Sequence, residues 1–184
     1  KLGENETALV GGTENMSMSP HADFTSRFAG VKLGALKLED MLQSTLTDEY
    51  CGCGIGITAE NLAKKYGITR EAQDAYAYES HRRAARACES GRFAKEIVPV
   101  DMRTRSGTAS VDADEHIKKE TTLEKLRRLR PSFQKDGTVT AGNASGINDG
   151  AASLVIASEN YVNNTDKEPL AKLLAWGVAG VDPS

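Results

Sequence analysis

The chain has 184 residues, of which 39% are hydrophobic and 5% aromatic, and its formal net charge is −3 at pH 7. This length and hydrophobic content suit one ordinary domain, or one domain that carries a large insertion. The charge gives no general attraction to nucleic acid or to a membrane surface, so an anion site needs a local cluster of basic residues. No apolar run approaches the roughly 18–20 residues of a membrane span.

The three cysteines of the chain, Cys51, Cys53 and Cys88, cannot all pair with one another. This odd number favours a reducing, intracellular compartment. One residue separates Cys51 from Cys53, whereas redox motifs have two intervening residues and zinc sites need a second ligand pair. We therefore predict no metal site.

Both ends of the chain lie close to predicted strands. The runs Thr7–Val10 and Leu170–Ala179 each predict a strand, the first of a buried type. Because the chain also begins without methionine, we expect a fragment of a larger fold. The segment up to Leu38 has few periodic hydrophobic residues and predicts a long loop, in which Phe24 and Phe28 line either a partner surface or an ordinary core contact.

Two consecutive helices are predicted in the centre of the chain. The first has Thr58 as its N-cap and ends before Gly67. The second follows the N-cap Thr69 and has Gly91 just beyond its C-terminal end. Acidic residues lie in the first turns of the second helix and arginines toward its end, an order that suits the helix dipole and indicates a solvated face rather than a nucleic-acid stripe.

Three further strands are predicted from short apolar runs. Two of them, Glu96–Val100 and Ser110–Ala113, lie on either side of a turn at Gly107. The third, Ala151–Ala157, predicts a buried strand because nearly all of its residues are apolar.

A basic cluster lies before the last of these strands. Within it Thr121 and Glu124 have the spacing of a capping box, and Pro131 ends the predicted helix. Backbone N–H groups, the dipole and ammonium charges at such a helix start favour a phosphate, so Lys118 and Thr121 are candidates for anion binding. A solvated amphipathic helix is the alternative, and nucleic-acid binding is a third interpretation. The cluster comprises His116, Lys118, Lys119, Lys125, Arg127, Arg128, Arg130 and Lys135.

The stretch Thr138–Ala152 is the part of the chain richest in small and turn-forming residues. Gly142, Gly146 and Gly150 lack a Cβ atom, and polar neighbours such as Ser145 offer hydrogen bonds to turns and helix starts. Two interpretations stay open at this point: a surface that a ligand approaches closely, or a series of tight turns.

Four segments resemble the signatures of the thiolase family, in the same order: Gly11–Pro20, Gly56–Ala63, Gly91–Pro99 and Thr138–Ala152. The resemblance covers essentially the whole chain. It implies an α/β fold, namely part of the αβαβα layered thiolase fold with an inserted α+β loop domain. The implied domains are the end of the N-terminal half at 1–20, the loop domain with its tetramerisation loop and CoA-binding region at 21–140, and the last strand of the N-terminal half with the first strand of the C-terminal half at 141–184.

The resemblance also implies that the catalytic residues lie outside this chain. In thiolases the nucleophilic cysteine precedes the segment that matches Gly11–Pro20, and the catalytic histidine and second cysteine lie beyond the position of Ser184. We therefore expect the chain alone to be inactive. Cys51, Cys53 and Cys88 match loop-domain positions and are not expected to replace the nucleophile.

What the resemblance implies for this chain is the binding of coenzyme A (CoA), as a substrate rather than as a covalently bound cofactor. Lys118 would supply charge for the nucleotide phosphates and Ser145 a hydrogen bond. Because most thiolases have arginine where Lys118 stands, phosphate binding here would depend on a point charge. The implied CoA-binding residues are Lys118, Thr121, Lys125, Ala141, Ser145, Gly146 and, along the pantetheine tunnel, Leu46 and Ile55.

The implied activity is thiolytic cleavage of 3-ketoacyl-CoA by CoA in fatty-acid degradation. Gly54 and Ile55 stand where many acetoacetyl-CoA thiolases have a His-Met pair, which favours this activity over the alternative, acetyl-CoA acetyltransferase. A non-catalytic CoA-binding fragment is a further alternative. Segments 31–40 and 121–126 resemble mitochondrial members most, so we expect mitochondria ahead of cytoplasm or peroxisomes. The region His21–Leu38 matches the tetramerisation loop, which implies a homodimer or homotetramer.

Overall fold

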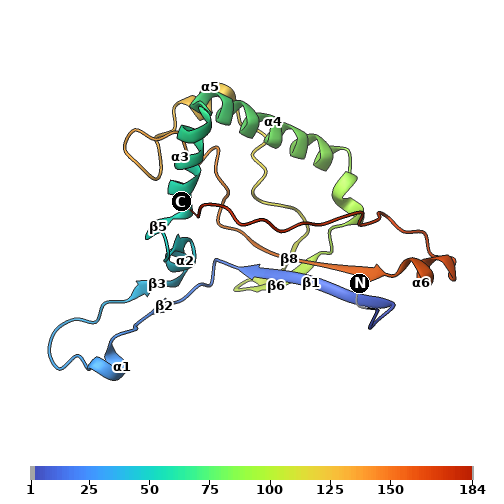
Figure 1. Cartoon of the computed structure of the whole chain (residues 1–184), viewed down its shortest axis with the longest axis horizontal. Helices are drawn as coiled ribbons and strands as arrows, with labels where there is room; N and C mark the ends of the chain where they lie inside the picture. Colours follow the sequence, from blue (N-terminus) through green and yellow to red (C-terminus); the bar gives the residue numbers. More distant parts are fainter. Residues whose placement is uncertain (1–2, 184) are drawn as a thin grey trace. The chain divides into compact units, whose positions relative to one another are not determined.

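The computed structural model describes residues 3–183, with only the backbone of residue 29, and Figure 1 labels most of its elements. Its contacts divide it into two compact units: 3–45 with 147–183, which we call the ribbon unit, and Leu46–Gly146, which we call the helical unit. Both contain helices and strands. The domain boundaries implied by the family, after residues 20 and 140, stay predictions.

The ribbon unit is built on two antiparallel strands, β1 (Thr7–Asn15) and β8 (Asp149–Ala157), which pair from Thr7 with Ala157 to Asn15 with Asp149. Both predicted strands are confirmed and are longer than predicted. The expectation that they are buried was wrong, because all nine residues of β8 are exposed and β1 has only Ala8 partly buried. A strand becomes buried only when another layer covers it, and the described residues supply no such layer.

Short elements complete the ribbon unit. The predicted loop up to Leu38 contains a one-turn helix, and His21–Ala22 pairs with Glu39–Asp40. The strand predicted at Leu170–Ala179 is wrong: among the described residues this segment has no strand partner, and an apolar run forms a strand only when its main-chain groups are paired. The elements are α1 (Ser26–Ala29), β2 (His21–Ala22), β3 (Glu39–Asp40), α2 (Met41–Thr45) and α6 (Glu159–Asn163).

The helical unit contains the two predicted central helices, which are confirmed. Gly67 ends the first in a left-handed conformation, with φ 64°, and Gly91 follows the second with φ 71°. The Thr69 hydroxyl caps the second helix by accepting a hydrogen bond from the Ala72 N–H at 3.2 Å. The elements are β4 (Thr47–Asp48), β5 (Cys53–Gly54), α3 (Ile55–Tyr66), α4 (Arg70–Glu89), the 3-10 turn η1 (Arg92–Lys95), β6 (Val100–Thr104), β7 (Gly107–Val111) and α5 (Leu123–Arg127).

The start of α3 differs from the prediction. The helix begins at Ile55, three residues before the predicted N-cap Thr58, whose hydroxyl instead donates to the Ile55 carbonyl at 2.7 Å. The cause is the β4–β5 pair, which leads directly into the helix because the Ile55 N–H donates to the Leu46 carbonyl at 2.9 Å.

Two other boundaries also shift. The hairpin strands are β6 and β7 rather than Glu96–Val100 and Ser110–Ala113, and Gly107, with φ 136°, starts the second strand. The N-cap of α5 is Thr122 rather than Thr121, since the Thr122 hydroxyl accepts from the Lys125 N–H at 3.2 Å. Thr121 and Thr122 are both suitable N-cap residues by type. Which of them caps the helix depends on the backbone geometry, which the sequence does not give.

Among the described residues, every buried side chain lies in the helical unit. The apolar ones are Ala63, Leu126 and Val139, and the polar ones are Glu60, Asp74 and Thr140. None of the helices in residues 3–183 is both long and apolar enough to cross a membrane.

Candidate functional site

All eight predicted CoA-binding residues lie in the helical unit, in three groups. The first group is the tunnel pair, Leu46 and Ile55. The second is the basic arm, the segment 115–125 with Lys118, Thr121 and Lys125. The third is the small-residue loop, the segment 138–146 with Ala141, Ser145 and Gly146.

The structure joins the two members of the tunnel pair directly. The hydrogen bond from the Ile55 N–H to the Leu46 carbonyl holds the start of α3 against the residue before β4. The side chain of Ile55 is 54% exposed, while Leu46 is partly buried. An exposed apolar side chain at this point is able to contact a ligand without a change in the core.

The basic arm presents its charges at the surface. The Thr121 N–H donates to the Lys118 carbonyl at 3.1 Å, and Lys125 Nζ donates to the Glu120 carbonyl at 2.6 Å. Helix α5 has five residues only, and the Thr122 side chain already satisfies one of its first N–H groups. A helix of one turn has a small dipole, so anion binding at this helix start would depend on the lysine side chains.

The small-residue loop packs directly on α5. A Cβ atom on Gly142 would lie 2.5 Å from both Leu126 Cδ2 and Leu129 Cδ1, so only glycine permits this approach. Ala141 and Ser145, on either side of this contact, are exposed. The structure thus brings the small-residue loop together with α5, the helix that contains the end of the basic arm.

A buried polar network holds this loop in place, and the sequence did not reveal it. Asp74 of α4 is 1% exposed and accepts hydrogen bonds from Arg70 Nε and Asn143 Nδ2, both at 2.9 Å. Arg70 Nη2 in turn donates to the carbonyl of Leu126 at 2.6 Å, and Asn143 Oδ1 accepts from the Thr140 N–H at 2.8 Å. Helix α4 therefore fixes both α5 and the loop. The sequence did contain one signal for this network: Arg70 lies four residues before Asp74, a spacing at which two side chains of a helix can form an ion pair.

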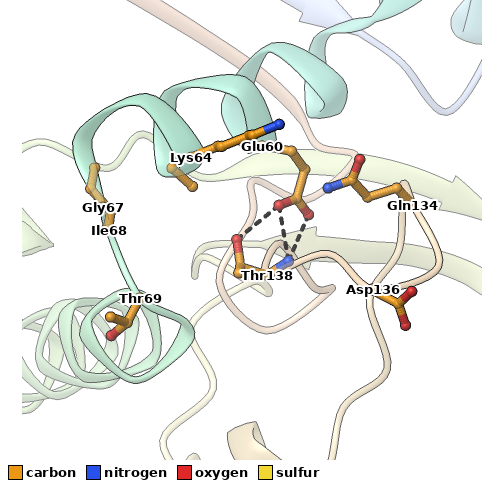
Figure 2. Close-up of a pocket in the computed structure, with 9 residues that line it drawn as sticks. Glu60, Lys64, Gly67, Ile68, Thr69, Gln134, Asp136 and Thr138 are labelled. Atoms are coloured by element: carbon orange, nitrogen blue, oxygen red, sulfur yellow. Dashed lines mark hydrogen bonds between the residues drawn. The ribbon is translucent and has the colours of Figure 1, made fainter.

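A second buried carboxylate holds the start of the loop. Glu60 of α3 is 4% exposed, and Figure 2 shows it pointing at Thr138. It accepts from the Thr138 N–H and Oγ1 and from the Val139 N–H, each at 2.8 Å. Burial alone would raise the pKa of Glu60, but these hydrogen bonds outweigh it and hold the pKa below its ordinary value of 4.5.

A surface pocket of about 370 Å³ lies beside this carboxylate, as Figure 2 shows. None of the eight predicted CoA-binding residues lines it. Its polar lining groups include Glu60 and Thr138, which already bond to each other. The lining residues are Glu60, Ala63, Lys64, Gly67, Ile68, Thr69, Gln134, Asp136 and Thr138.

All three cysteines lie in the helical unit. Cys51, Cys53 and Cys88 are each partly buried. Within the part of the chain that the structure describes, no group of three or more His, Cys, Asp or Glu side chains is placed to hold a metal ion.

This chain is similar to known proteins in both sequence and structure. The family described as "Thiolase, N-terminal domain" matches residues 1–160. The mitochondrial 3-ketoacyl-CoA thiolase of Pongo abelii is 48% identical over 182 residues, which are 98% of this chain and 46% of that protein. The chain thus spans about half the length of the curated relatives it matches.

Several solved structures are similar to this one. The acetyl-CoA acetyltransferase of Bacillus anthracis has a TM-score of 0.92 at 43% identity, over 99% of this chain and 46% of that one. Human mitochondrial 3-ketoacyl-CoA thiolase in complex with CoA has a TM-score of 0.77 at 44% identity, over 86% of this chain and 39% of that one. The predicted thiolase-type α/β fold is confirmed by these similarities. With a family match over most of its length, the chain belongs to the thiolase family.

Proposed function

We propose that this chain provides the CoA-binding part of a thiolase that cleaves 3-ketoacyl-CoA with CoA. The observation that carries the proposal is the packing of Gly142 on Leu126, which joins the small-residue loop to α5. CoA needs both surfaces: ammonium groups for its phosphates and a small-sided surface with hydrogen-bonding groups for its pantetheine arm. The similarity to a thiolase that was crystallised with CoA also supports the proposal.

In the proposed reaction a cysteine thiolate attacks the 3-keto carbon of the substrate, and the bond between C2 and C3 breaks. The acetyl-CoA carbanion that leaves takes up a proton, and the thiol of CoA then attacks the acyl-cysteine thioester and frees the cysteine. We place this cysteine outside the chain. The residues of the basic arm and the small-residue loop would hold the nucleotide and pantetheine parts of the CoA substrates.

The first test is calorimetric titration of the 184-residue chain with CoA and with 3′-dephospho-CoA. If Lys118 contacts the 3′-phosphate, CoA should bind more tightly by about fivefold, as expected for one partly solvated charge pair. Lys118→Ala should remove this difference. Lys95→Ala, which removes one exposed charge elsewhere in the same unit, is the matched control. A difference that survives Lys118→Ala would contradict the proposed role of Lys118.

A second test concerns catalysis. The purified 184-residue chain is mixed with 3-ketoacyl-CoA and CoA, and the substrate's absorbance is monitored. We expect no turnover. The reason is the proposed place of the nucleophile outside the chain. Turnover that tracks the concentration of this polypeptide would show that one of its own residues replaces the nucleophile.

Acetyl-CoA acetyltransferase is the second candidate activity, and the similarity to the Bacillus anthracis structure favours it. The ratio of kcat/KM for acetoacetyl-CoA to that for longer 3-ketoacyl-CoA, measured on the intact enzyme, separates the two. We place the enzyme in mitochondria, in fatty-acid degradation, and propose that it forms a homotetramer through the region His21–Leu38. The exposure of Phe28, at 94%, and Leu33, at 96%, supports this contact.

A further inference from the structure

Helix α4 carries a histidine that contacts the basic arm. The backbone N–H of Lys118 donates a hydrogen bond to Nδ1 of His81 over 3.3 Å. The His81 side chain is partly buried, whereas Lys118 is exposed. A group from the body of the unit thus holds the main chain of the residue to which we assign the phosphate contact.

The other hydrogen bonds of Lys118 are local. Its carbonyl accepts from the Thr121 N–H, and its Nζ lies 3.4 Å from the Glu115 carbonyl, so both partners are three residues away. His81 is 37 residues away in the sequence. The imidazole therefore ties this point of the arm to α4. A tilted ring contact between His81 and His116 and an exposed pair between Lys119 and Glu89 at 3.8 Å also join the arm to this helix.

The hydrogen bond depends on the protonation state of His81. Neutral imidazole has one acceptor nitrogen and imidazolium has none, so Nδ1 accepts from Lys118 only while the ring is neutral with its proton on Nε2. The titratable groups that face the ring are His116, whose ring centroid is 6.1 Å away, and Lys118. Burial, and then the positive charges of these two residues, hold the pKa of His81 below its ordinary value of 6.5. At neutral pH the bond is therefore intact.

We propose that His81 is a positioning residue for the CoA phosphates: its neutral imidazole fixes the main chain at Lys118, and protonation of Nδ1 releases the arm. The inference rests on the proposed role of Lys118 in CoA binding. It adds pH regulation to that site, because the main chain at Lys118 is held at neutral pH and released in acid.

The direction of the pH effect follows from the neutral form being favoured in the folded state. The bond contributes fully above the ordinary pKa of 6.5 and is lost as the pH falls through the lower pKa of the folded state. A phosphate monoester such as that of CoA also titrates at about pH 6. The contribution of His81 must therefore be measured as a difference between variants at each pH.

The test is calorimetric titration of CoA into the full 184-residue chain at pH 7.5 and at lower pH, for the wild type, His81→Leu, His81→Asn and Lys118→Ala. His81→Leu removes the acceptor and should weaken CoA binding at pH 7.5 by about three- to tenfold. His81→Asn keeps an oxygen near the position of Nδ1. It should stay within about twofold of the wild type and lack the additional loss in acid.

Two outcomes would overturn the inference, and they differ in what they say about the proposed function. If Lys118→Ala weakens binding while His81→Leu does not, only the inference fails. If Lys118→Ala binds CoA like the wild type, the phosphate contact and the inference fail together.

If His81→Leu does not fold, an NMR titration of the wild type and His81→Asn tests the inference instead. The Lys118 amide signal of the ¹⁵N-labelled wild type should shift with a midpoint below pH 6.5, the ordinary pKa of histidine. The shift should disappear in His81→Asn. An amide signal that does not respond to pH in the wild type would overturn the hydrogen bond on which the inference rests.

Discussion

The helical unit buries polar side chains, whereas the β1–β8 ribbon exposes apolar ones. Glu60, Asp74 and Thr140 of the helical unit are 4%, 1% and 0% exposed. In the ribbon, Leu9 is 77% exposed and Val155 is 75% exposed. The contrast is opposite to the usual preference of these side chains, so each region needs a separate physical explanation.

The difference lies in what holds each region together. The ribbon is an antiparallel ladder of main-chain hydrogen bonds, which depends little on which side chains it carries. In the helical unit, side chains join segments that are distant in the sequence: Asp74 to Asn143 and Glu60 to Thr138 are 69 and 78 residues apart. Single substitutions should therefore cost much more in the helical unit than in the ribbon.

The largest effect is expected for Asp74→Ala. Removal of this carboxylate leaves Arg70 and Asn143 without their buried partner, which should lower the free energy of unfolding by about 3–5 kcal/mol. Urea unfolding followed by circular dichroism at the helical band measures the change. Asp114→Ala, at an exposed position, is the control. A loss below about 1 kcal/mol would mean that the network does not hold the unit together.

Glu60→Gln should have the next largest effect. The amide oxygen keeps the bonds made at Oε1, but the NH₂ group that replaces Oε2 then faces the N–H donor of Thr138, at a cost of about 1–3 kcal/mol. Because the pKa of Glu60 is lowered by folding, its contribution is present above the ordinary pKa of 4.5 and is lost as the pH falls through the folded-state value.

Urea unfolding of Glu60→Gln and the wild type between pH 7 and pH 3 separates this contribution from those of other carboxylates. The difference between the two proteins should shrink as the pH falls below 4.5, the ordinary pKa of a glutamate. Glu49→Gln, at an exposed position, is the matched control. A constant difference over the whole range would remove the assigned role of the Glu60 charge.

The smallest effect, and the most direct comparison of the two regions, comes from a pair of glycines. Gly142→Ala places a methyl group against Leu126 and Leu129 and should cost about 1–2 kcal/mol. Gly150→Ala, in β8, meets nothing within 4 Å and should change stability by less than about 0.5 kcal/mol. Thermal unfolding of both variants measures the contrast. Equal effects would show that the two regions do not differ in packing.

Part of the fold could be predicted from local residues. Thr69, Gly67 and Gly91 mark helix ends through hydrogen bonds and backbone conformations that depend on their immediate neighbours. The start of α3 could not be predicted, because the bond from Ile55 to Leu46 depends on the β4–β5 pair. The failed strand at Leu170–Ala179 has a similar cause, since strand pairing is a property of two segments.

The candidate site divides in the same way. The residue types that suit CoA, such as Lys118 and Ser145, could be chosen by family resemblance from the sequence. Asp74 is one of the acidic residues that were predicted only to lie in the first turns of the second helix, and nothing local indicated that it bonds to Asn143. His81 was not singled out at all, because its partner Lys118 lies 37 residues later in the sequence.

The sequence by itself determined the family, the helix ends at Gly67, Thr69 and Gly91, and the chemical types of the proposed site residues, because motifs and caps depend on residues near one another in the chain. Only the tertiary structure decided which polar groups are buried, which carbonyl holds α3 and which imidazole holds Lys118. Burial and hydrogen bonding between distant segments are properties of the packed chain, and no window of neighbouring residues contains both partners.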